Sequence, residues 1–412
     1  ADLTITLTRI MIPFLLLIAL AAQAMGILNA LNRFGLPALA SAFFNVGSIV
    51  GCLLLGFVLG PTIGLTAIEG MAYGTLVGGF LQFVVQWPSL IRAGFSYRPM
   101  LSISDPGVRQ IFRLMGPAVI GTAAVQINVF VNTNFASSII DPATGAVANG
   151  PVSWLNYAFR FMQFPIGIFG VAIATAALPP LSRSSAQQDY IEFRQTLSHA
   201  LALIFVLCVP SAVGLAVLGR PIVALVFEHG RFTAFDTLQT GNALAAYAIG
   251  LAGYAAVKVL SPAFYALRDA RTPMLISLGS IAVNYMMNSL LVGPFGHVGL
   301  AFSTSTVALI NFALLLLFIR GRLGGLDGRR LGLKLLRICA AALPMAAVAW
   351  LASALCDALP LAGISLRLVQ VSTSIALAAI VFYVGCGLFR IEELNEAVGG
   401  IGGRLLGRLR RK

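Results

Sequence analysis

Uninterrupted apolar stretches of about twenty residues recur along the whole chain. A helix that crosses a hydrocarbon core of about 30 Å needs about 20 predominantly apolar residues. Runs such as Leu314–Phe318 do not alternate between apolar and polar residues, as the strands of a membrane barrel would. The qualifying stretches are 8–30, 38–60, 64–91, 109–138, 151–180, 194–219, 236–266, 273–294, 297–320, 331–357 and 366–389. The sequence therefore predicts an all-α, polytopic membrane helical bundle of about 11 transmembrane helices.

Turn and breaker residues separate these stretches. Pro165 and Pro262 lie inside stretches and are expected to kink their helices. The breakers expected to end helices include Gly60-Pro61, Gly219 before Arg220-Pro221, and Gly293-Pro294.

The composition excludes a water-soluble protein. The chain is 58% hydrophobic and only 10% charged, whereas a soluble domain is about 25% charged. Five scattered cysteines exclude a disulfide scaffold. A net charge of +13 is often a sign of nucleic-acid binding, but here the distribution of basic residues over the loops explains it better. We expect no nucleic-acid partner.

The basic residues fall mainly on one side of the predicted bundle. Most of the 27 Lys and Arg residues lie after the odd-numbered stretches or in the C-terminal tail. By the positive-inside rule that side is cytoplasmic, which puts the C-terminus in the cytoplasm and the N-terminus outside. A cytoplasmic start would then need an odd number of further helices upstream, so we expect this chain to be a fragment. Only Arg9, Arg220, Arg231 and Arg367 lie on the opposite side.

An internal repeat indicates two lobes. Residues 26–37 read GILNALNRFGLP and residues 262–273 read PAFYALRDARTP, with Ala30 aligned to Ala266 and Pro37 to Pro273. An even number of helices separates the copies, so both insert the same way up, as in transporters built from parallel repeats. The expected organisation is 1–92, the second half of an N-terminal lobe; 93–108, a cytoplasmic linker; 109–320, a six-helix C-terminal lobe; 321–389, two additional helices; and 390–412, a basic cytoplasmic tail attracted to anionic phospholipids.

Arg160 is the main candidate for a functional charge. It lies about nine residues into its stretch, roughly 14 Å below the membrane surface, and no acid lies within one helical turn. A charge near the bilayer centre costs about 2.5–3.5 kcal/mol, and a guanidinium without a local counter-ion suits a phosphate group. The alternative is pairing with a distant acid. We predict that Arg160 binds substrate, together with Asn156 and Gln163 of the same helix.

Other polar residues within the stretches have more ordinary explanations. Lys258 lies near a predicted helix end, where snorkelling accounts for it, and Glu69 is expected at the interface. A second group of side chains could present oxygens to Na⁺, although interhelical hydrogen bonding is the preferred interpretation. Its members are Asn132, Asn284, Asn288 and Thr304.

Enzyme signatures are missing from the sequence. There is no H-E-x-x-H, no G-x-S-x-G, no G-x-x-x-x-G-K and no paired cysteine motif. We therefore expect a protein that is not an enzyme and that uses no cofactor. Na⁺, protons or the membrane potential are the candidates for coupling.

Several segments resemble the MurJ (MviN) family of bacterial lipid II flippases, within the multidrug/oligosaccharidyl-lipid/polysaccharide flippase superfamily. The run around Arg160 carries the most specific resemblance. The matching segments are GILNALNRFGLPA (26–38), residues 116–137, residues 152–182, LVFEHGRFTAFDT (225–237), VKVLSPAFYALRDARTP (257–273) and GHVGLAFSTS (296–305). The family has fourteen helices, so the resemblance implies that the first three are absent here.

The resemblance implies export of undecaprenyl-diphosphate-linked disaccharide-pentapeptide, lipid II, from the inner to the outer leaflet. It implies alternating access of a central cationic cavity between two lobes, with Arg160 contacting the diphosphate and Ser153 facing the cavity. Other members have acids at the positions of Phe159 and Gln163, and this chain does not. Some members bind Na⁺ where Asn132, Asn284, Asn288 and Thr304 fall, but none of these four is an acid. Stretches 331–357 and 366–389 match the pair that forms a groove for the polyprenyl tail.

The resemblance also implies a place in the bacterial inner membrane and a role in peptidoglycan biosynthesis and cell shape, with the cell-wall synthesis machinery as a partner. Two alternatives stay open. One is a multidrug or polysaccharide exporter of the same superfamily, and the other is a membrane scaffold that transports nothing.

Overall fold

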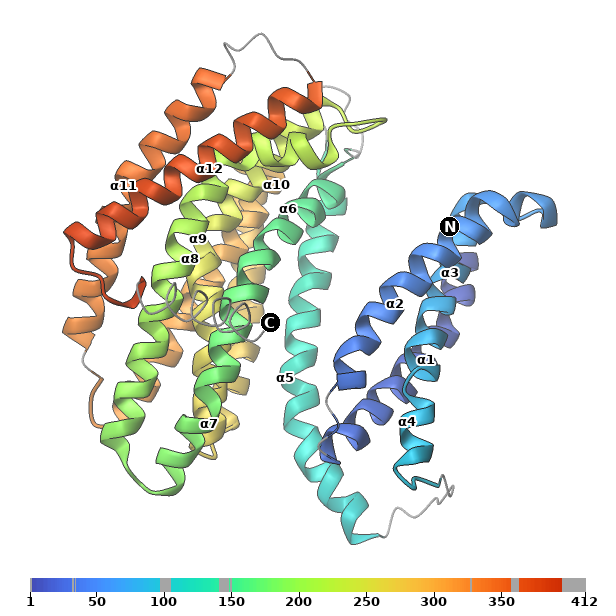
Figure 1. Ribbon diagram of the computed structural model, residues 1–412, viewed down its shortest axis with the longest axis horizontal. Helices are drawn as coiled ribbons and strands as arrows, with labels where there is room; N and C mark the ends of the chain where they lie inside the picture. The colour runs from blue at the N-terminus through green and yellow to red at the C-terminus, as the bar shows by residue number, and fades with distance from the viewer. Residues whose placement is uncertain are drawn as a thin grey trace, which may run out of the picture. The chain divides into compact units, whose positions relative to one another are not determined.

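Every regular element in the described part of the chain is a helix (Figure 1). The computed structural model describes residues 2–31, 33, 35–96, 105–140, 148, 150–326, 328–356 and 363–394. The α-helices are α1 Asp2–Ala30, α2 Gly35–Leu53, α3 Ala67–Val84, α4 Trp87–Arg92, α5 Pro106–Ser137, α6 Pro151–Pro165, α7 Ala172–Ala186, α8 Tyr190–Phe227, α9 Ala234–Ala266, α10 Arg271–Arg322, α11 Gly328–Cys356 and α12 Gly363–Leu388. Most of the predicted tail, residues 395–412, lies outside the described residues.

The prediction of an all-α membrane bundle is confirmed. Among the described residues, nine helical segments are long and apolar enough to cross a membrane. Helix α10 covers two predicted spans, 273–294 and 297–320, and α5 covers the span 109–138. The chain is therefore a multi-pass membrane protein.

Two predicted breaks differ from the structure. The helix does not end at Arg220-Pro221, because α8 continues through them to Phe227. Arg220 donates a hydrogen bond to Asn242 Oδ1 at 3.0 Å and is exposed. This polar residue lowers the local hydropathy, but the helix continues beyond the apolar stretch and includes it. Near Gly293-Pro294 the backbone bends at Gly296 instead, with φ 56° and ψ −137°, values that favour glycine.

Pro165 and its surroundings show how a proline is accommodated inside a span. It ends α6, and a π-helical turn, Ile166–Val171, joins α6 to α7 without breaking the segment. A proline removes one backbone donor, and π-turns often occur where the regular helical ladder is interrupted. A second π-turn, Leu54–Val58, continues α2 and leads into a 3-10 turn, Gly60–Ile63.

The chain divides into two compact units, residues 1–103 and 104–412. In the first, α2 packs on α3 and α1 packs on α3. Glycines allow the close approach of α2 and α3: a Cβ atom on Gly74 would lie 2.3 Å from the Cys52 backbone nitrogen. The capping box of Thr66 and Glu69 begins α3, which gives Glu69 a structural role at the helix end.

In the second unit, α9 is the central helix. Helices α6, α7, α8 and α10 all pack against it, and most of its apolar side chains are buried. Helices α11 and α12 pack on each other and on α8, while α5 packs on α10 (Figure 1). An ion pair between Arg367 Nη2 and Glu228 Oε1, 2.5 Å long, ties α12 to the end of α8.

The predicted repeat has matching helix boundaries. Helix α1 ends at Ala30 and α9 at Ala266, the two residues that the repeat aligns. A connection of the same length follows in each copy. The next helix begins at Gly35 in the first copy and at Arg271 in the second.

Candidate functional site

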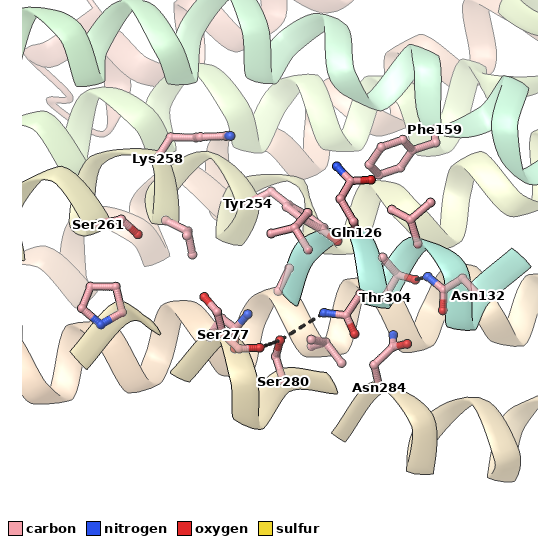
Figure 2. A pocket seen from close by; sticks show the side chains of 18 of the residues that line it. Gln126, Asn132, Phe159, Tyr254, Lys258, Ser261, Ser277, Ser280, Asn284 and Thr304 are labelled. Carbon is pink, nitrogen blue, oxygen red and sulfur yellow. Dashed lines mark hydrogen bonds between the residues drawn. The ribbon is translucent and has the colours of Figure 1, made fainter. Parts of the chain in front are cut away.

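A cavity of about 1020 Å³ opens among α5, α6, α9 and α10, entirely within the second unit. Helix α5 packs closely on α10 but makes only limited contact with α6, so space is left between them. Figure 2 shows side chains of α9, such as Tyr254 and Lys258, and side chains of α10, such as Ser277 and Asn284, around this space. In a membrane protein, polar side chains inside a span face such a wet cavity or a neighbouring helix.

One face of α9 supplies a stripe of polar and aromatic residues to the cavity. Tyr247, Tyr254, Lys258, Ser261 and Tyr265 all line it, and their spacings of three, four and seven residues place them on one side of a helix. Sequence inspection singled out only Lys258 in this stripe. The periodic spacing of the hydroxyl groups was the signal that could have revealed the others.

Phe159 of α6 closes the wall between α6 and α9. Its ring lies edge-on to Tyr247 with centroids 5.5 Å apart and to Tyr254 with centroids 6.5 Å apart. A hydrogen bond of 2.8 Å from Trp154 Nε1 to Asp236 Oδ1 anchors the first turn of α6 on α9. Together these contacts fix the rotation of α6 and so determine which of its residues face the cavity.

The cavity is cationic. Lys258 and Arg268 line it, and no carboxylate does among the described residues. The acid adjacent to Arg268 in sequence, Asp269, already has partners for both oxygens. Oδ1 accepts hydrogen bonds from the backbone N–H groups of Arg271 and Thr272, and Oδ2 accepts one from the Thr272 hydroxyl at 2.5 Å and forms an ion pair with Arg322 Nη2 at 3.1 Å. Neither Lys258 nor Arg268 forms an ion pair with a described residue.

The environment of Asp269 also changes its titration. Burial alone would raise the pKa of this carboxyl group. The hydrogen bonds from Thr272 and Arg271 and the charge of Arg322 outweigh burial and hold the pKa below its ordinary value. Asp269 thus stays ionised and keeps the connection between α9 and α10 in place.

The four amide and hydroxyl residues considered as an ion site do come together between α5 and α10. Asn132 Nδ2 donates to Thr304 Oγ1 at 3.0 Å, and Asn288 Nδ2 donates to Asn132 Oδ1 at 2.7 Å and to Asn284 Oδ1 at 3.1 Å. One turn away, Asn128 Nδ2 donates to Ser280 Oγ at 3.2 Å. Three of the oxygens that would face an ion already accept hydrogen bonds. The geometry is that of an interhelical hydrogen-bond network.

The predicted substrate residues share one face of α6. Ser153, Asn156, Arg160 and Gln163 are all exposed, whereas Trp154, Ala158 and Met162 on the opposite face are buried. Asn156 lines the cavity, and the other three lie beside it on the helix without lining it. Within the described part of the chain, Arg160 makes no ion pair and no side-chain hydrogen bond.

Residues that hold metals are not grouped in the described ranges. No three His, Cys, Asp or Glu side chains there are close enough to bind a metal ion. The guanidinium, ammonium, hydroxyl and amide groups that line the cavity suit the binding of an anionic group.

Comparison with known proteins decides the family. The sequence profile of the lipid II flippase MurJ family matches residues 1–369. The chain belongs to the MurJ lipid II flippase family. It is 36% identical over 324 residues to the lipid II flippase MurJ of Burkholderia cenocepacia, an alignment covering 78% of this chain and 60% of that protein. This MurJ-family chain spans about three fifths of the length of the curated relatives it matches.

Solved structures agree with this family. The lipid II flippase MurJ in its inward closed conformation superposes with a TM-score of 0.73 at 26% identity, covering 94% of this chain and 74% of that one. An inward-facing multidrug resistance transporter of the MATE family superposes with a TM-score of 0.65 at 15% identity, covering 79% of this chain and 73% of the transporter, which shows a shared fold.

Proposed function

We propose that this chain is part of a flippase that moves lipid II from the inner to the outer leaflet of the bacterial inner membrane. Membership of the MurJ family supports the substrate class, and the absence of carboxylates from the described cavity lining supports an anionic headgroup. The proposal extends to alternating access as the mechanism, with the C-terminus in the cytoplasm and the N-terminus in the periplasm. No covalent chemistry is required of the chain.

The proposal depends mainly on the position of Arg160 and on its lack of a carboxylate partner among the described residues. It lies on the exposed polar face of a membrane-spanning helix, and no described carboxylate neutralises it. Keeping an unpaired guanidinium in such a segment is costly, and a bidentate phosphate contact would offset that cost. Arg160 is therefore assigned to the diphosphate, with Ser153, Asn156 and Gln163 as neighbouring polar contacts.

The remaining parts of the chain receive roles by the same reasoning. Residues 1–92 are proposed as the second half of an N-terminal lobe and residues 109–320 as the six-helix C-terminal lobe, with 93–108 as the cytoplasmic linker between them. Helices α11 and α12, within 321–389, pack on α8 rather than around the cavity, which suits a groove for the polyprenyl tail. The segment 390–412 is proposed to lie on anionic phospholipid, and the cell-wall synthesis machinery is the expected protein partner.

The test uses the full-length natural protein in cells depleted of their own flippase. Lipid II exposed at the outer leaflet is measured by its accessibility to an externally added hydrolase. Arg160→Ala should lower exposure at least about tenfold, the effect of losing one charge-assisted contact. Arg320→Ala, which removes an exposed arginine from the end of α10, should leave it unchanged. Normal export by Arg160→Ala would refute the role of Arg160, and rescue of drug efflux in place of lipid II export would favour the exporter alternative.

A further inference from the structure

Helices α11 and α12 form a pair that is attached to one side of the second unit. They pack on each other and on α8, which is the main helix of the unit that they contact (Figure 1). No hydrophobic force favours association between helices inside a bilayer, because lipid tails are as apolar as the helix surfaces. The attachment of this pair therefore depends on close packing and on polar contacts.

The pair itself is stiff. Gln370 Nε2 of α12 donates hydrogen bonds to the backbone carbonyl oxygen and to the hydroxyl group of Ser353 in α11, both at 3.0 Å. Gly385 of α12 lies so close to α11 that an added Cβ atom would be 3.3 Å from the Ala341 Cβ. A displacement of one helix therefore moves the other, and a few contacts at the ends of the pair suffice to hold both helices.

Arg367 attaches the start of α12 to the end of α8, and we call this the 228–367 contact. Its Nη2 donates to Glu228 Oε1 at 2.5 Å, and its Nη1 donates to the carbonyl oxygens of Ala224 and Glu228 at 3.2 and 3.3 Å. The end of a helix carries partial negative charge on its carbonyl groups, which favours a cation there. Glu228 Oε2 accepts a hydrogen bond from Thr237 Oγ1 of α9 at 2.6 Å. One guanidinium thus joins α12 to α8 and, through Glu228, to α9.

The 228–367 contact also explains a basic residue on the side of the bundle that is poor in positive charge. Arg367 is one of only four such residues on that side. Its side chain is 27% exposed and that of Glu228 is 19% exposed, so water screens this pair less than it screens a fully exposed pair. A guanidinium with several charge-assisted hydrogen bonds in such a place holds its partners strongly.

A second contact lies at the opposite end of the pair. The backbone turns after α12 at Arg390, with φ 54°, and Ile391, Glu393 and Leu394 are buried. Glu393 forms an ion pair with Lys334 near the start of α11, and we call this the 334–393 contact. Ile391 and Leu394 belong to the same buried apolar cluster as residues of α8 and of the end of α10. The chain that follows α12 is therefore held against the rest of the second unit.

The electrostatics of Glu393 connect the 334–393 contact to α8. Burial alone would raise the pKa of Glu393. The hydrogen bond from Lys334, a backbone hydrogen bond, and the charges of Lys334 and of His199 in α8 outweigh burial and hold the pKa below its ordinary value. Glu393 thus stays ionised and is attracted to α8 as well as to α11.

We propose that the 228–367 and 334–393 contacts fix α11 and α12 to the rest of the second unit, so that the pair moves with that unit as one body during transport. Alternating access moves one bundle of helices against another, and a pair that is held at both ends of its spans follows the bundle that holds it. The inference deepens the proposed function and rests on it for the transport cycle. Arg367 and Glu393 are positioning residues, which act through the helices and not on the substrate.

The first experiment measures hydrogen exchange at the two ends of α12 in the full-length natural protein in lipid nanodiscs. Arg367→Gln and Lys334→Gln each remove one charge-assisted contact, so amide exchange near the affected end of α12 should become about tenfold faster. Arg231→Gln and Arg337→Gln are the matched controls, because both arginines are exposed and form no ion pair with a described residue. Unchanged exchange in either test variant would overturn the inference, which needs both contacts.

The second experiment asks whether the pair moves with the unit. Glu228→Cys combined with Arg367→Cys removes the ion pair, and a flexible bismaleimide then joins the two thiols covalently. Export of lipid II by proteoliposomes should be slower than in the parent before the link forms and should return to the parent rate afterwards. The parent and the two single variants, treated with the same reagent, control for reaction at the other cysteines. Linked protein that exports more slowly than the parent would overturn the inference, because the pair must then move relative to α8.

The two experiments separate this inference from the proposed function. Hydrogen exchange needs no transport, so it tests both contacts in a protein that exports nothing. A full-length protein that shows the expected exchange in all four variants but exports no lipid II contradicts only the proposed function.

Discussion

Asp269 shows how one side chain can stabilise the connection next to the cavity. Only 7% of its side chain is exposed, both of its oxygens accept hydrogen bonds from the start of α10, and Oδ2 also forms an ion pair with Arg322. Its pKa is lowered because the hydrogen bonds from Thr272 and the charge of Arg322 outweigh the effect of burial. A lowered pKa in the folded state means that the ionised carboxylate stabilises the fold.

We expect Asp269→Asn to lower the free energy of unfolding by about 1–2 kcal/mol at pH 7, since it removes a charged acceptor. The stabilisation is present above the unfolded pKa of about 4 and disappears as the pH falls through the lower folded pKa. The difference from the parent chain should therefore close below about pH 4. Thermal unfolding across this range measures it.

The matched control for this prediction is Asp189→Asn. Asp189 caps α8 through the N–H groups of Ile191 and Glu192, but it is exposed and makes no ion pair with a described residue. Its substitution should have little effect, because asparagine is also a good N-cap. A difference for Asp269→Asn that is the same at pH 7 and at pH 3 would show that its charge does not matter.

At the scale of elements, glycine sets the distance between α2 and α3. We predict that Gly74→Ala disrupts this pair, since the added Cβ would lie 2.3 Å from the Cys52 backbone nitrogen, and backbone atoms cannot yield cheaply. Gly26→Ala in α1 is the control, because nothing lies within 4 Å of its added Cβ. It should be neutral or slightly stabilising. Equal unfolding temperatures for the two variants would contradict close packing of α2 on α3.

The amide network between α5 and α10 makes a second prediction at this scale. Asn132→Ala removes the hydrogen bonds to Thr304 and Asn288 and should cost about 1–2 kcal/mol for two interhelical contacts. Asn134→Ala is the control, because Asn134 is exposed and its side chain forms no hydrogen bond with a described residue. Thermal unfolding of the two variants distinguishes them, and an equal loss in both would remove the structural role of the network.

The stability that this network provides should not depend on whether Na⁺ or K⁺ is in solution. Three of its four side-chain oxygens accept hydrogen bonds from amide groups, the exception being the buried Asn288 Oδ1, and no carboxylate of a described residue lines the adjoining cavity. Unfolding temperatures measured in equal concentrations of NaCl and KCl should therefore agree. A stabilisation specific to Na⁺ that Asn132→Ala abolishes would instead make this group an ion site.

For the whole molecule, the sequence predicted the helices well and the cavity poorly. Long apolar stretches define membrane spans because the bilayer imposes one length on all of them. The helix end predicted at Arg220-Pro221 was wrong. Local hydropathy marks the end of the apolar stretch, whereas α8 continues beyond that point to Phe227. The polar face around Arg160 was visible from spacing alone.

The cavity could not be predicted because four helices from distant parts of the sequence enclose it. Lys258 and Arg268 appeared as an interfacial lysine and a loop arginine until α5, α6 and α10 placed them in one cavity. The ion pair of Asp269 with Arg322 could not be predicted either, since Asp269 lies in the turn before α10 and Arg322 is the last residue of α10.

The proposed function requires a positive charge at residue 160 for export of lipid II. The most direct measurement is the rate at which lipid II appears on the far leaflet of proteoliposomes containing the full-length natural protein, with Arg, Lys, Gln or Glu at position 160. We expect rates that fall in that order, with at least about a tenfold drop from Arg to Gln. Equal rates for Arg, Gln and Glu would contradict it.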